Sequence, residues 1–380
     1  MSAHEVELLV RSGDLAAAAD LLETRLGAQS SPGEWLRLAG LRRALRQPAK
    51  ALEAVHGALA AAPLDFVALA MRASLVETLD PDAAGQAWSE ALAQRPAGPL
   101  PPPLAAAADA GAVIRDAWID RRDRRLAAAT APHEGEAGED ARWRLARFRS
   151  NTLRRTRVYH SEPTHFAYPG LVEREFHPRQ RFPWLAELEA ATDAIREEMR
   201  EVIANDRSDL VPYIDYQAHE ALAQWKPLNR NRDWTAAHLI RQGETIAANA
   251  ERCPRTMALL SRLPQPAIPG AGPNAMFSLL APRTTIPPHV GVNNARLVCH
   301  LPLVIPPGGC WFRVGAETRE WREGEAFVFD DTIEHEAANP TDHLRVVLIL
   351  DVWHPDLSAP ERAGVAAAIA SEGAGPAGAL

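Results

Sequence analysis

Residues 288–355 read PHVGVNNARLVCHLPLVIPPGGCWFRVGAETREWREGEAFVFDDTIEHEAANPTDHLRVVLILDVWHP. Short runs rich in Val, Ile, Leu, Phe and Trp alternate here with turn signals, such as PPGG at 306–309 and REGE at 322–325. Such runs predict β-strands joined by hairpins. Because no helical pattern separates them, the strands favour an antiparallel jelly roll, here a double-stranded β-helix, over a parallel α/β sheet.

The composition is that of a globular protein with room for more than one domain. The 380 residues carry a formal net charge of −8, and 47% of them are hydrophobic. The acidic balance and the lack of a clustered basic face argue against nucleic-acid binding. No apolar run approaches the length of a membrane span, and the first residues lack the pattern of a secretory signal. We therefore expect a cytoplasmic protein without a membrane partner.

The N-terminal part carries a repeat. Ala18, Ala51 and Ala84 are spaced by 33 residues, and Pro63 and Pro96 recur at the same interval. Stacked helix pairs need small residues where helices approach and a proline between units, so the first 96 residues are expected to form a helical array. The pattern resembles degenerate tetratricopeptide repeats. Two functions stay open: a surface for a protein partner or for self-association, or a cap that only shields the next domain.

The rest of the chain divides by composition. Residues 97–141 begin with consecutive prolines and become alanine-rich, which predicts a semi-rigid linker followed by a helix. Residues 142–360 are expected to hold the jelly roll with flanking helices, so the whole chain is predicted to be an α + β multidomain protein. Residues 361–380 are rich in Ala, Gly and Pro, and we expect a flexible tail there.

Two histidines and one arginine carry the chemistry of the strand region. His289 and His335 fall at the edges of predicted strands, 46 residues apart, and Arg345 opens an otherwise apolar strand. Ferrous iron that must also bind an oxidant and a co-substrate needs few protein ligands and open positions, and the usual solution is two histidines and one carboxylate on one face. The two histidines at equivalent strand ends, followed by Arg345, form a joint signal for such a site. An arginine that enters an apolar core needs an anionic partner, which a dicarboxylate co-substrate would supply. Ser278 and His300 lie on neighbouring predicted strands and could add contacts.

On these motifs, residues 274–357 resemble the aspartyl/asparaginyl β-hydroxylase family of iron(II)- and 2-oxoglutarate-dependent oxygenases. The matching segments are FSLLAPRTTIPPHVGVNNARLVCHLPLVIP, GEAFVFDDTIEHEAANPTD and LRVVLILDVWHP, and a weaker likeness extends back to about Arg157. The resemblance implies Fe(II) as the metal, with 2-oxoglutarate and O₂ as co-substrates. Tetratricopeptide-like repeats ahead of the oxygenase domain also occur in this family.

The resemblance gives each of these candidates a role. His289 and His335 match the iron ligands, and they would form the catalytic centre. Arg345 and Ser278 match the groups that hold the distal carboxylate of 2-oxoglutarate. His300 matches a contact to the other end of the same molecule.

The substrate side of the site matches the family less closely. Arg296 matches an arginine near the acidic side chain of the substrate, and Trp234 and Gln242 lie in a segment that resembles the substrate-facing part of the family. Some members carry an arginine where this chain has Val298, so either Arg296 compensates or the substrate differs. Gly291 stands where the wider superfamily has a carboxylate ligand. Characterised members of this family also have glycine there, and water completes the coordination.

Three further positions have open roles. Arg283 replaces a residue that is commonly glycine in the family, which would reshape the mouth of the site. Asp330 and Asp331 precede the second histidine, and one of them could hydrogen-bond a metal-bound water. The alternative for these aspartates is a turn at the end of a strand.

The resemblance therefore predicts hydroxylation of an unactivated C–H bond, at the β-carbon of an Asp or Asn residue or in a related substrate. That substrate would be a peptide, a free amino acid or a carrier-bound residue. A non-catalytic repeat scaffold, whose jelly roll binds a metal or a metabolite, is the alternative and predicts no turnover. A zinc-bound cupin-type enzyme is a third possibility, and it predicts retained zinc without dependence on 2-oxoglutarate.

Overall fold

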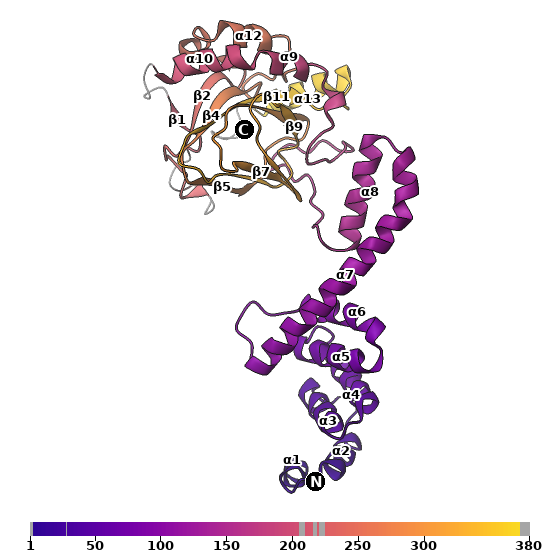
Figure 1. The fold of residues 1–380 in the computed structure, drawn as a ribbon. Helices are drawn as coiled ribbons and strands as arrows, with labels where there is room; N and C mark the ends of the chain where they lie inside the picture. The colour runs from indigo at the N-terminus through magenta and orange to yellow at the C-terminus, as the bar shows by residue number, and fades with distance from the viewer. Residues whose placement is uncertain (1–2, 28, 205–209, 216–218, 220–224, 373–380) are drawn as a thin grey trace. The chain divides into compact units, whose positions relative to one another are not determined.

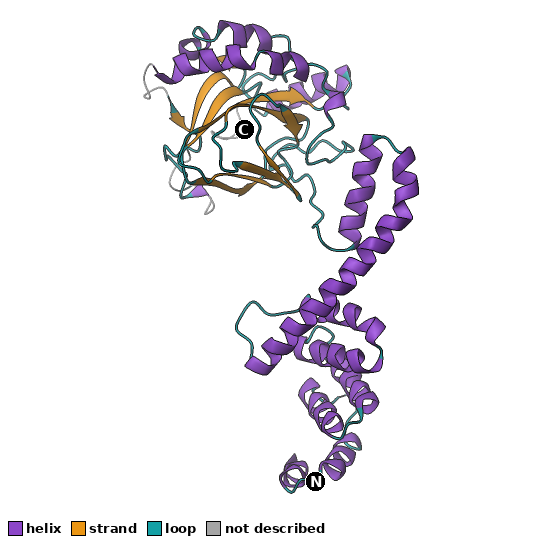
Figure 2. Ribbon diagram, viewed as in Figure 1, coloured by secondary structure: helices purple, strands orange, loops and turns teal. Residues whose placement is uncertain are grey.

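The structure is a computed structural model, and it describes residues 3–27, 29–204, 210–215, 219 and 225–372. The chain divides into two compact units, Met1–Arg155 and Thr156–Leu380 (Figure 1). The first unit is helical, and the second combines two β-sheets with helices (Figure 2).

Helices of the first unit follow one another in pairs that repeat the 33-residue period. They are α1 (Ala3–Arg11), α2 (Leu15–Glu23), α3 (Pro32–Ala44), α4 (Pro48–Ala61), α5 (Phe66–Leu79), α6 (Pro81–Leu92), α7 (Pro102–Glu136) and α8 (Glu139–Thr152). Ala18, Ala51 and Ala84 lie on the second helix of successive pairs, and each is at most 2% exposed. The small side chains therefore lie where neighbouring helices approach, as the repeat predicted.

The starts of these helices follow from local sequence. The carboxylate of Asp14 accepts a hydrogen bond from the backbone of Ala17 at 3.0 Å, which caps α2. Ser31 and Glu34 form a capping box at the start of α3. Both α4 and α6 begin with a proline in the first turn, where the missing N–H costs nothing.

The segment predicted to be a linker followed by a helix contains a long helix, α7, and belongs to the helical unit. α7 runs without a break for 35 residues, and its first half packs on α6, where Gly111 lies under the indole of Trp88. α8 then folds against α7 through ion pairs, among them Arg149 with Asp123 at 3.1 Å. The unit therefore ends at residue 155 and not at 141. The predicted boundary was wrong because α8 buries no side chain and gives no apolar periodicity.

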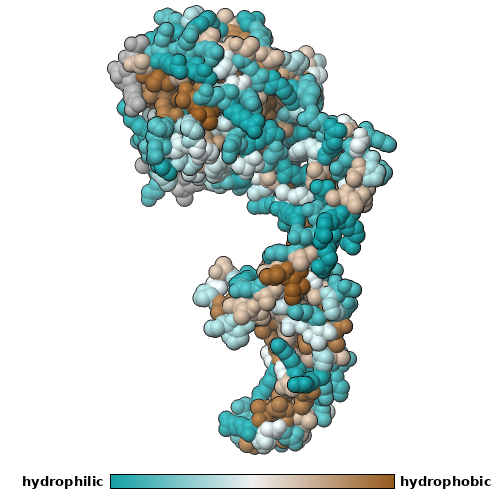
Figure 3. Space-filling view, viewed as in Figure 1, coloured by the Kyte–Doolittle hydropathy of each residue, from teal (hydrophilic) through white to brown (hydrophobic). Residues whose placement is uncertain are grey.

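The surface of the α7–α8 segment is mainly hydrophilic on the visible face (Figure 3). Its charged residues pair with one another, as Arg155 does with Asp120 at 2.6 Å. Across the described residues, no helix combines the length and the hydrophobicity that crossing a bilayer requires.

The second unit contains the predicted strands. They are β1 (Val211–Pro212), β2 (Trp234–Arg241), β3 (Glu244–Thr245), β4 (Ala275–Leu280), β5 (Thr284–His289), β6 (Arg296–Val304), β7 (Trp311–Val314), β8 (Glu317–Glu320), β9 (Phe327–Phe329), β10 (His335–Asn339) and β11 (Arg345–Trp353). The described strands form a seven-stranded sheet in the order β1-β2-β4-β11-β6-β9, with β3 on β2, and a four-stranded sheet in the order β5-β10-β7-β8. All of these pairs are antiparallel, and from β4 onward the chain passes back and forth between the two sheets. The predicted double-stranded β-helix is confirmed.

Alternate side chains of each central strand face opposite sides of the larger sheet. On β11, Leu348 and Leu350 face outward into a hydrophobic core, whereas Val347 and Ile349 face the interior between the two sheets. The outward core is covered by helices α9 (Leu185–Ala190), α10 (Thr192–Ala204) and α12 (Pro254–Leu260), as Figure 1 shows. The period of two places Arg345 on the inward face with Val347. The interior of the β-helix is therefore where the polar candidates meet.

The C-terminal stretch forms a helix where a flexible tail was expected. Helix α13 (Ala359–Ser371) starts with a capping box between Ser358 and Glu361. The hydroxyl of Tyr168 donates to Glu361 at 2.9 Å, and Ile369 is only 4% exposed. The prediction was therefore wrong for residues 361–371, because the cap and these contacts hold the helix in place. Residues 373–380 lie outside the described residues.

Tryptophans lie directly on glycines in the helical unit. A Cβ on Gly57 would lie 2.4 Å from the ring of Trp35, and a Cβ on Gly111 would lie 2.3 Å from the ring of Trp88. Both distances are far inside van der Waals contact, so the helices can approach this closely only over glycine. Gly40, by contrast, lies in α3 with nothing within 4 Å of its Cβ position.

Gly111→Ala should therefore destabilise the helical unit by about 1–3 kcal/mol, because the added methyl overpacks a buried tryptophan. Gly40→Ala is the matched control, and it should stabilise the unit by up to about 1 kcal/mol, since alanine favours the helix. Urea denaturation followed by the helical circular dichroism signal measures both. Equal effects of the two variants would contradict this account of the packing.

Candidate active site

His289 and His335 stand opposite each other in the four-stranded sheet. His289 ends β5 and His335 begins β10, and the two are register partners in that antiparallel pair. Their ring centroids are 3.9 Å apart, and the rings are tilted by 53°. The register shifts just after His335, and such bulges often re-aim side chains at functional sites. The fold thus brings together two histidines that lie 46 residues apart in sequence.

Backbone hydrogen bonds determine which nitrogen of each ring is free. Nδ1 of His289 lies 2.8 Å from the carbonyl oxygen of Pro287, and Nδ1 of His335 lies 3.1 Å from that of Ile333. A carbonyl oxygen can only accept, so Nδ1 carries the proton and Nε2 keeps its lone pair. Burial lowers the pKa of His335 to about 4 and holds the pKa of His289 well below its usual value. Both rings are therefore neutral near pH 7, as metal ligands must be.

In the part of the chain that the structure describes, no third protein ligand stands beside the histidine pair. The described residues contain no group of three or more His, Cys, Asp or Glu side chains that could hold a metal ion. A Cβ at Gly291 would lie 2.2 Å from Oδ2 of Asp331, so the carboxylate of Asp331 takes the room that a side chain at 291 would need. A metal ion on this pair would keep its other positions for water and for small ligands, as an open catalytic site requires.

Arg345 is a buried cation that has no carboxylate partner among the described residues. It is 2% exposed, and its Nη1 donates to the carbonyl oxygen of Ser278 at 3.2 Å and lies 3.5 Å from the hydroxyl of the same residue. Its guanidinium lies 4.7 Å from the ring centroid of Trp321, and its Nε has no hydrogen-bond partner. Burial lowers its pKa to about 10, so it stays charged near pH 7. A buried and uncompensated charge is costly, and a bound anion would remove that cost.

Further polar atoms without partners lie near Arg345. Nδ1 of His300 and Nε1 of Trp321 are buried and unpaired, and these two rings lie 6.2 Å apart. Nε1 of Trp234 donates to the hydroxyl of Ser278 at 3.1 Å, which leaves the proton of that hydroxyl for a ligand. Ser278 and His300 were predicted to contact the co-substrate, whereas Trp321 was missed. The only signal for it was an isolated tryptophan after the polar strand β8.

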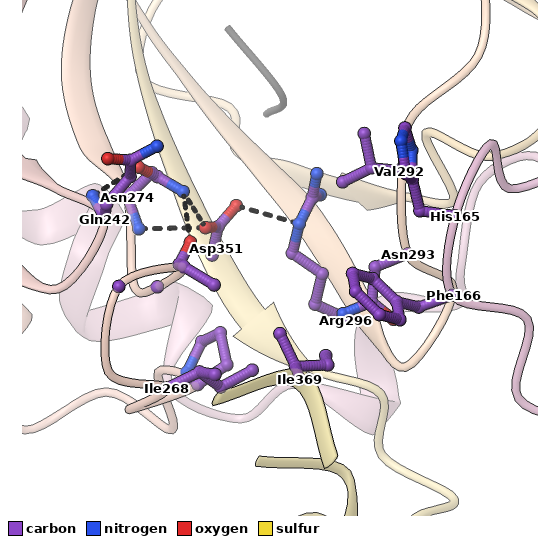
Figure 4. A pocket seen from close by; sticks show the side chains of 14 residues that line it. His165, Phe166, Gln242, Ile268, Asn274, Val292, Asn293, Arg296, Asp351 and Ile369 are labelled. Carbon is purple, nitrogen blue, oxygen red and sulfur yellow. Dashed lines mark hydrogen bonds and ion pairs between the residues drawn. The ribbon is translucent and has the colours of Figure 1, made fainter. Parts of the chain in front are cut away.

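The residues predicted to face the substrate fall into two places. Trp234 stacks on Tyr213 with 3.7 Å between ring centroids, and its ring centroid lies 6.3 Å from that of His289. Trp234 therefore belongs to the region of the histidine pair and Arg345. Gln242 and Arg296 line a pocket that includes neither Trp234 nor His289 (Figure 4).

Arg296 already has carboxylate partners within the fold. It is 5% exposed, its Nη2 lies 3.0 Å from Asp331, and its Nε lies 3.6 Å from Asp351. Asp351 also accepts a hydrogen bond from the backbone of Asn274 at 2.8 Å. Burial opposes the charge of Arg296, but the two aspartates outweigh it and raise the pKa of Arg296. An acidic substrate would have to compete with these two carboxylates for the guanidinium.

Asp330 and Arg283 have local structural roles. Asp330 accepts a hydrogen bond from the backbone of Thr332 at 2.9 Å and shapes the turn after β9. Burial raises the pKa of Asp330 to about 7. Arg283, predicted to reshape the mouth of the site, is exposed and pairs with Asp342 at 2.8 Å.

Together, the two facing histidines and the buried arginine define a jelly-roll protein that can hold a metal ion and an anion in its interior. The family model described as Aspartyl/Asparaginyl beta-hydroxylase matches residues 189–355. An ornithine lipid ester-linked acyl 2-hydroxylase of Rhizobium tropici is 33% identical over 204 residues, which cover 53% of this chain and 68% of that protein. The chain belongs to the aspartyl/asparaginyl beta-hydroxylase family.

Other relatives match a shorter segment. The aspartyl/asparaginyl beta-hydroxylase of Homo sapiens is 37% identical over 135 residues, which cover 36% of this chain and 18% of the human protein. The aspartate beta-hydroxylase domain-containing protein 2 of Xenopus tropicalis is 40% identical over 133 residues, which cover 34% of this chain and 36% of that protein. The matched segment thus spans about a fifth of the human relative and about a third of the frog one.

Arg345→Met should stabilise the protein without ligands by at least about 1 kcal/mol, because an apolar side chain replaces a buried charge that has no partner. Added 2-oxoglutarate should raise the melting temperature of the unchanged protein but not that of the variant. Arg283→Met, which removes an exposed cation, is the control and should alter neither quantity. Scanning calorimetry measures both. A variant that is less stable and still responds to 2-oxoglutarate would show that Arg345 is structural.

Proposed function

We propose that this protein is an iron(II)- and 2-oxoglutarate-dependent dioxygenase that hydroxylates a C–H bond, at the β-carbon of an Asp or Asn residue or in a related substrate. The observation that carries the proposal is the pairing of two neutral, facing histidines with a buried arginine that has no carboxylate partner in the described structure. Family membership supports the same reaction class.

The residues of the interior fit the iron and the co-substrate. Nε2 of His289 and Nε2 of His335 would bind iron, since their Nδ1 atoms are held by backbone carbonyls. Bound iron would supply the oxidation chemistry, in which O₂ and 2-oxoglutarate yield succinate, CO₂ and one oxygen atom for the substrate. Asp331, whose carboxylate fills the room beside Gly291, would accept a hydrogen bond from a metal-bound water.

The rest of the interior binds and orients the co-substrate. Arg345 would hold the distal carboxylate of 2-oxoglutarate, and the hydroxyl of Ser278 would donate to the same group. His300 would contact the other end of the molecule. The ring centroids of Phe312 and Phe329 lie 5.8 and 5.6 Å from that of His335, and these two rings form an apolar wall beside the histidine pair.

The substrate itself is proposed by class. The printed names of the relatives differ, since one is an aspartyl/asparaginyl hydroxylase and another an acyl hydroxylase of a lipid. For this chain we favour a peptide, a free amino acid or a carrier-bound residue, because its pocket beside Arg296 is lined by polar side chains as well as apolar ones. The helical unit would then present a surface for a protein partner or for a second copy.

His289→Ala and His335→Ala should each lower iron-dependent succinate formation by at least about a hundredfold, because each removes one of only two protein ligands. His160→Ala, which alters an exposed histidine, is the control and should leave the rate unchanged. The assay contains the full chain, Fe(II), ascorbate, 2-oxoglutarate and a peptide mixture, and succinate is quantified by mass spectrometry. Absence of turnover in the unchanged protein would favour a scaffold, and retained zinc without dependence on 2-oxoglutarate would favour a cupin-type zinc enzyme.

A further inference from the structure

The guanidinium of Arg296 already faces aspartates of the fold through two of its three nitrogens. Its Nη2 pairs with Asp331 at 3.0 Å, and its Nε faces Asp351 at 3.6 Å. Only Nη1 is buried without a partner. Firm recognition of a carboxylate by arginine uses two parallel N–H donors, either Nε with one terminal nitrogen or both terminal nitrogens. A carboxylate bound through both terminal nitrogens would therefore share Nη2 with Asp331, and one bound through Nε and Nη2 would meet the carboxylates of both Asp351 and Asp331.

The charge around Arg296 is already balanced. At least one of the two aspartates must be ionised to compensate a guanidinium that is 5% exposed. With one aspartate ionised the cluster is neutral, and with both ionised it is negative. A ligand carboxylate would therefore add a buried charge with no cation left to match it.

Arg296 is the only arginine, and no lysine occurs, among the described residues that line the pocket. Among the described residues, the polar lining consists of Gln242, Asn274, Asn293, His165, Asp351 and Arg296. Figure 4 shows Asp351 between Arg296 and Asn274, with Gln242 beside Asn274. On β6, the next inward residue after Arg296 is Val298, which is 6% exposed and pairs in register with Asp351. The position that could have added a cation beside Asp351 is apolar.

We propose that the pocket beside Arg296 accepts an uncharged polar group of the substrate, with a carboxamide as the best fit, and rejects a carboxylate in the same position. The oxygen of a carboxamide can accept from the N–H groups of Nη1 of Arg296, the guanidinium nitrogen that is buried without a partner among the described residues. Its N–H groups can donate to acceptors nearby, among them Oδ1 of Asp331, which is buried and has no partner. This assignment rests on the proposed function, because it names the substrate class of that site.

The pocket is tested with two probes of nearly equal shape, N-acetyl-asparagine N-methylamide and N-acetyl-aspartate N-methylamide. Their dissociation constants are measured by NMR titration of the full-length protein, loaded with Zn(II) and 2-oxoglutarate to prevent turnover. We expect the asparagine probe to bind at least about tenfold more tightly, since only the aspartate probe brings an unmatched buried charge.

Two variants test the charge argument by independent routes. Asp351→Asn removes one acid and frees Nε of Arg296, and Val298→Arg adds a cation next to Asp351. Each should shift the ratio of the two dissociation constants toward the aspartate probe by about tenfold. Asp342→Asn removes an exposed acid that pairs with Arg283, and it is the matched control that should leave the ratio unchanged. Retention of the melting-temperature increase with 2-oxoglutarate shows that each variant is folded.

The outcomes separate this inference from the proposed function. Iron-dependent conversion of 2-oxoglutarate to succinate tests the reaction, whereas probe binding tests the pocket. Preference for the asparagine probe without any turnover would sustain the pocket assignment and reject the oxygenase. Turnover together with equal binding, with preference for the aspartate probe or with no binding of either probe would overturn the pocket assignment. A ratio that neither folded variant shifts would overturn it as well.

Discussion

The register between β5 and β10 is the constraint on which the rest of the site depends. It sets His289 directly opposite His335. The Nδ1 atom of each ring then donates to a backbone carbonyl, which leaves the lone pair of each Nε2 available for a metal ion. A slip of one residue would carry one ring to the other face of the sheet, because side chains alternate with a period of two. The same alternation on β11 directs Arg345 into the interior. The facing histidine pair and the inward position of Arg345 thus result from strand pairing.

Two buried arginines of the interior, Arg345 and Arg296, differ in whether an acidic side chain pairs with them in the described structure. Arg345 has a backbone carbonyl, a hydroxyl and an aromatic face around it but no acid, so its charge is left for a ligand. Arg296 has two aspartates, so its charge is used by the fold. Because Arg345 and Asp351 lie six positions apart on the same face of β11, the two environments occupy different levels of one barrel. The proposed acidic co-substrate would bind at the level of Arg345, and the proposed neutral group of the substrate would bind at the level of Arg296.

The features that depend on local residue patterns could be predicted from the sequence. Strand alternation, histidines at strand ends and a lone arginine in an apolar strand were sufficient to predict the β-helix, the histidine pair and the inward course of Arg345. The partners of Arg296 were not predictable, because Asp331 and Asp351 lie on other elements and reach it only through the packing of the sheets. Helix α8 was misassigned because ion pairs, not apolar periodicity, hold it. The capping box before α13 was readable from Ser358 and Glu361, although the composition of the segment suggested a tail.

The contact between Gly291 and Asp331 also limits the substitutions by which such a site can evolve. A carboxylate ligand cannot be gained at 291 by one substitution, because even a methyl group there would overlap the side chain of Asp331. Losing Asp331 first would deprive Arg296 of its shorter ion pair. A side chain at position 291 is therefore harmful while Asp331 is present, and the loss of Asp331 is harmful by itself. Gly291, Asp331 and Arg296 therefore depend on one another, and a change at one of these positions requires a change at another.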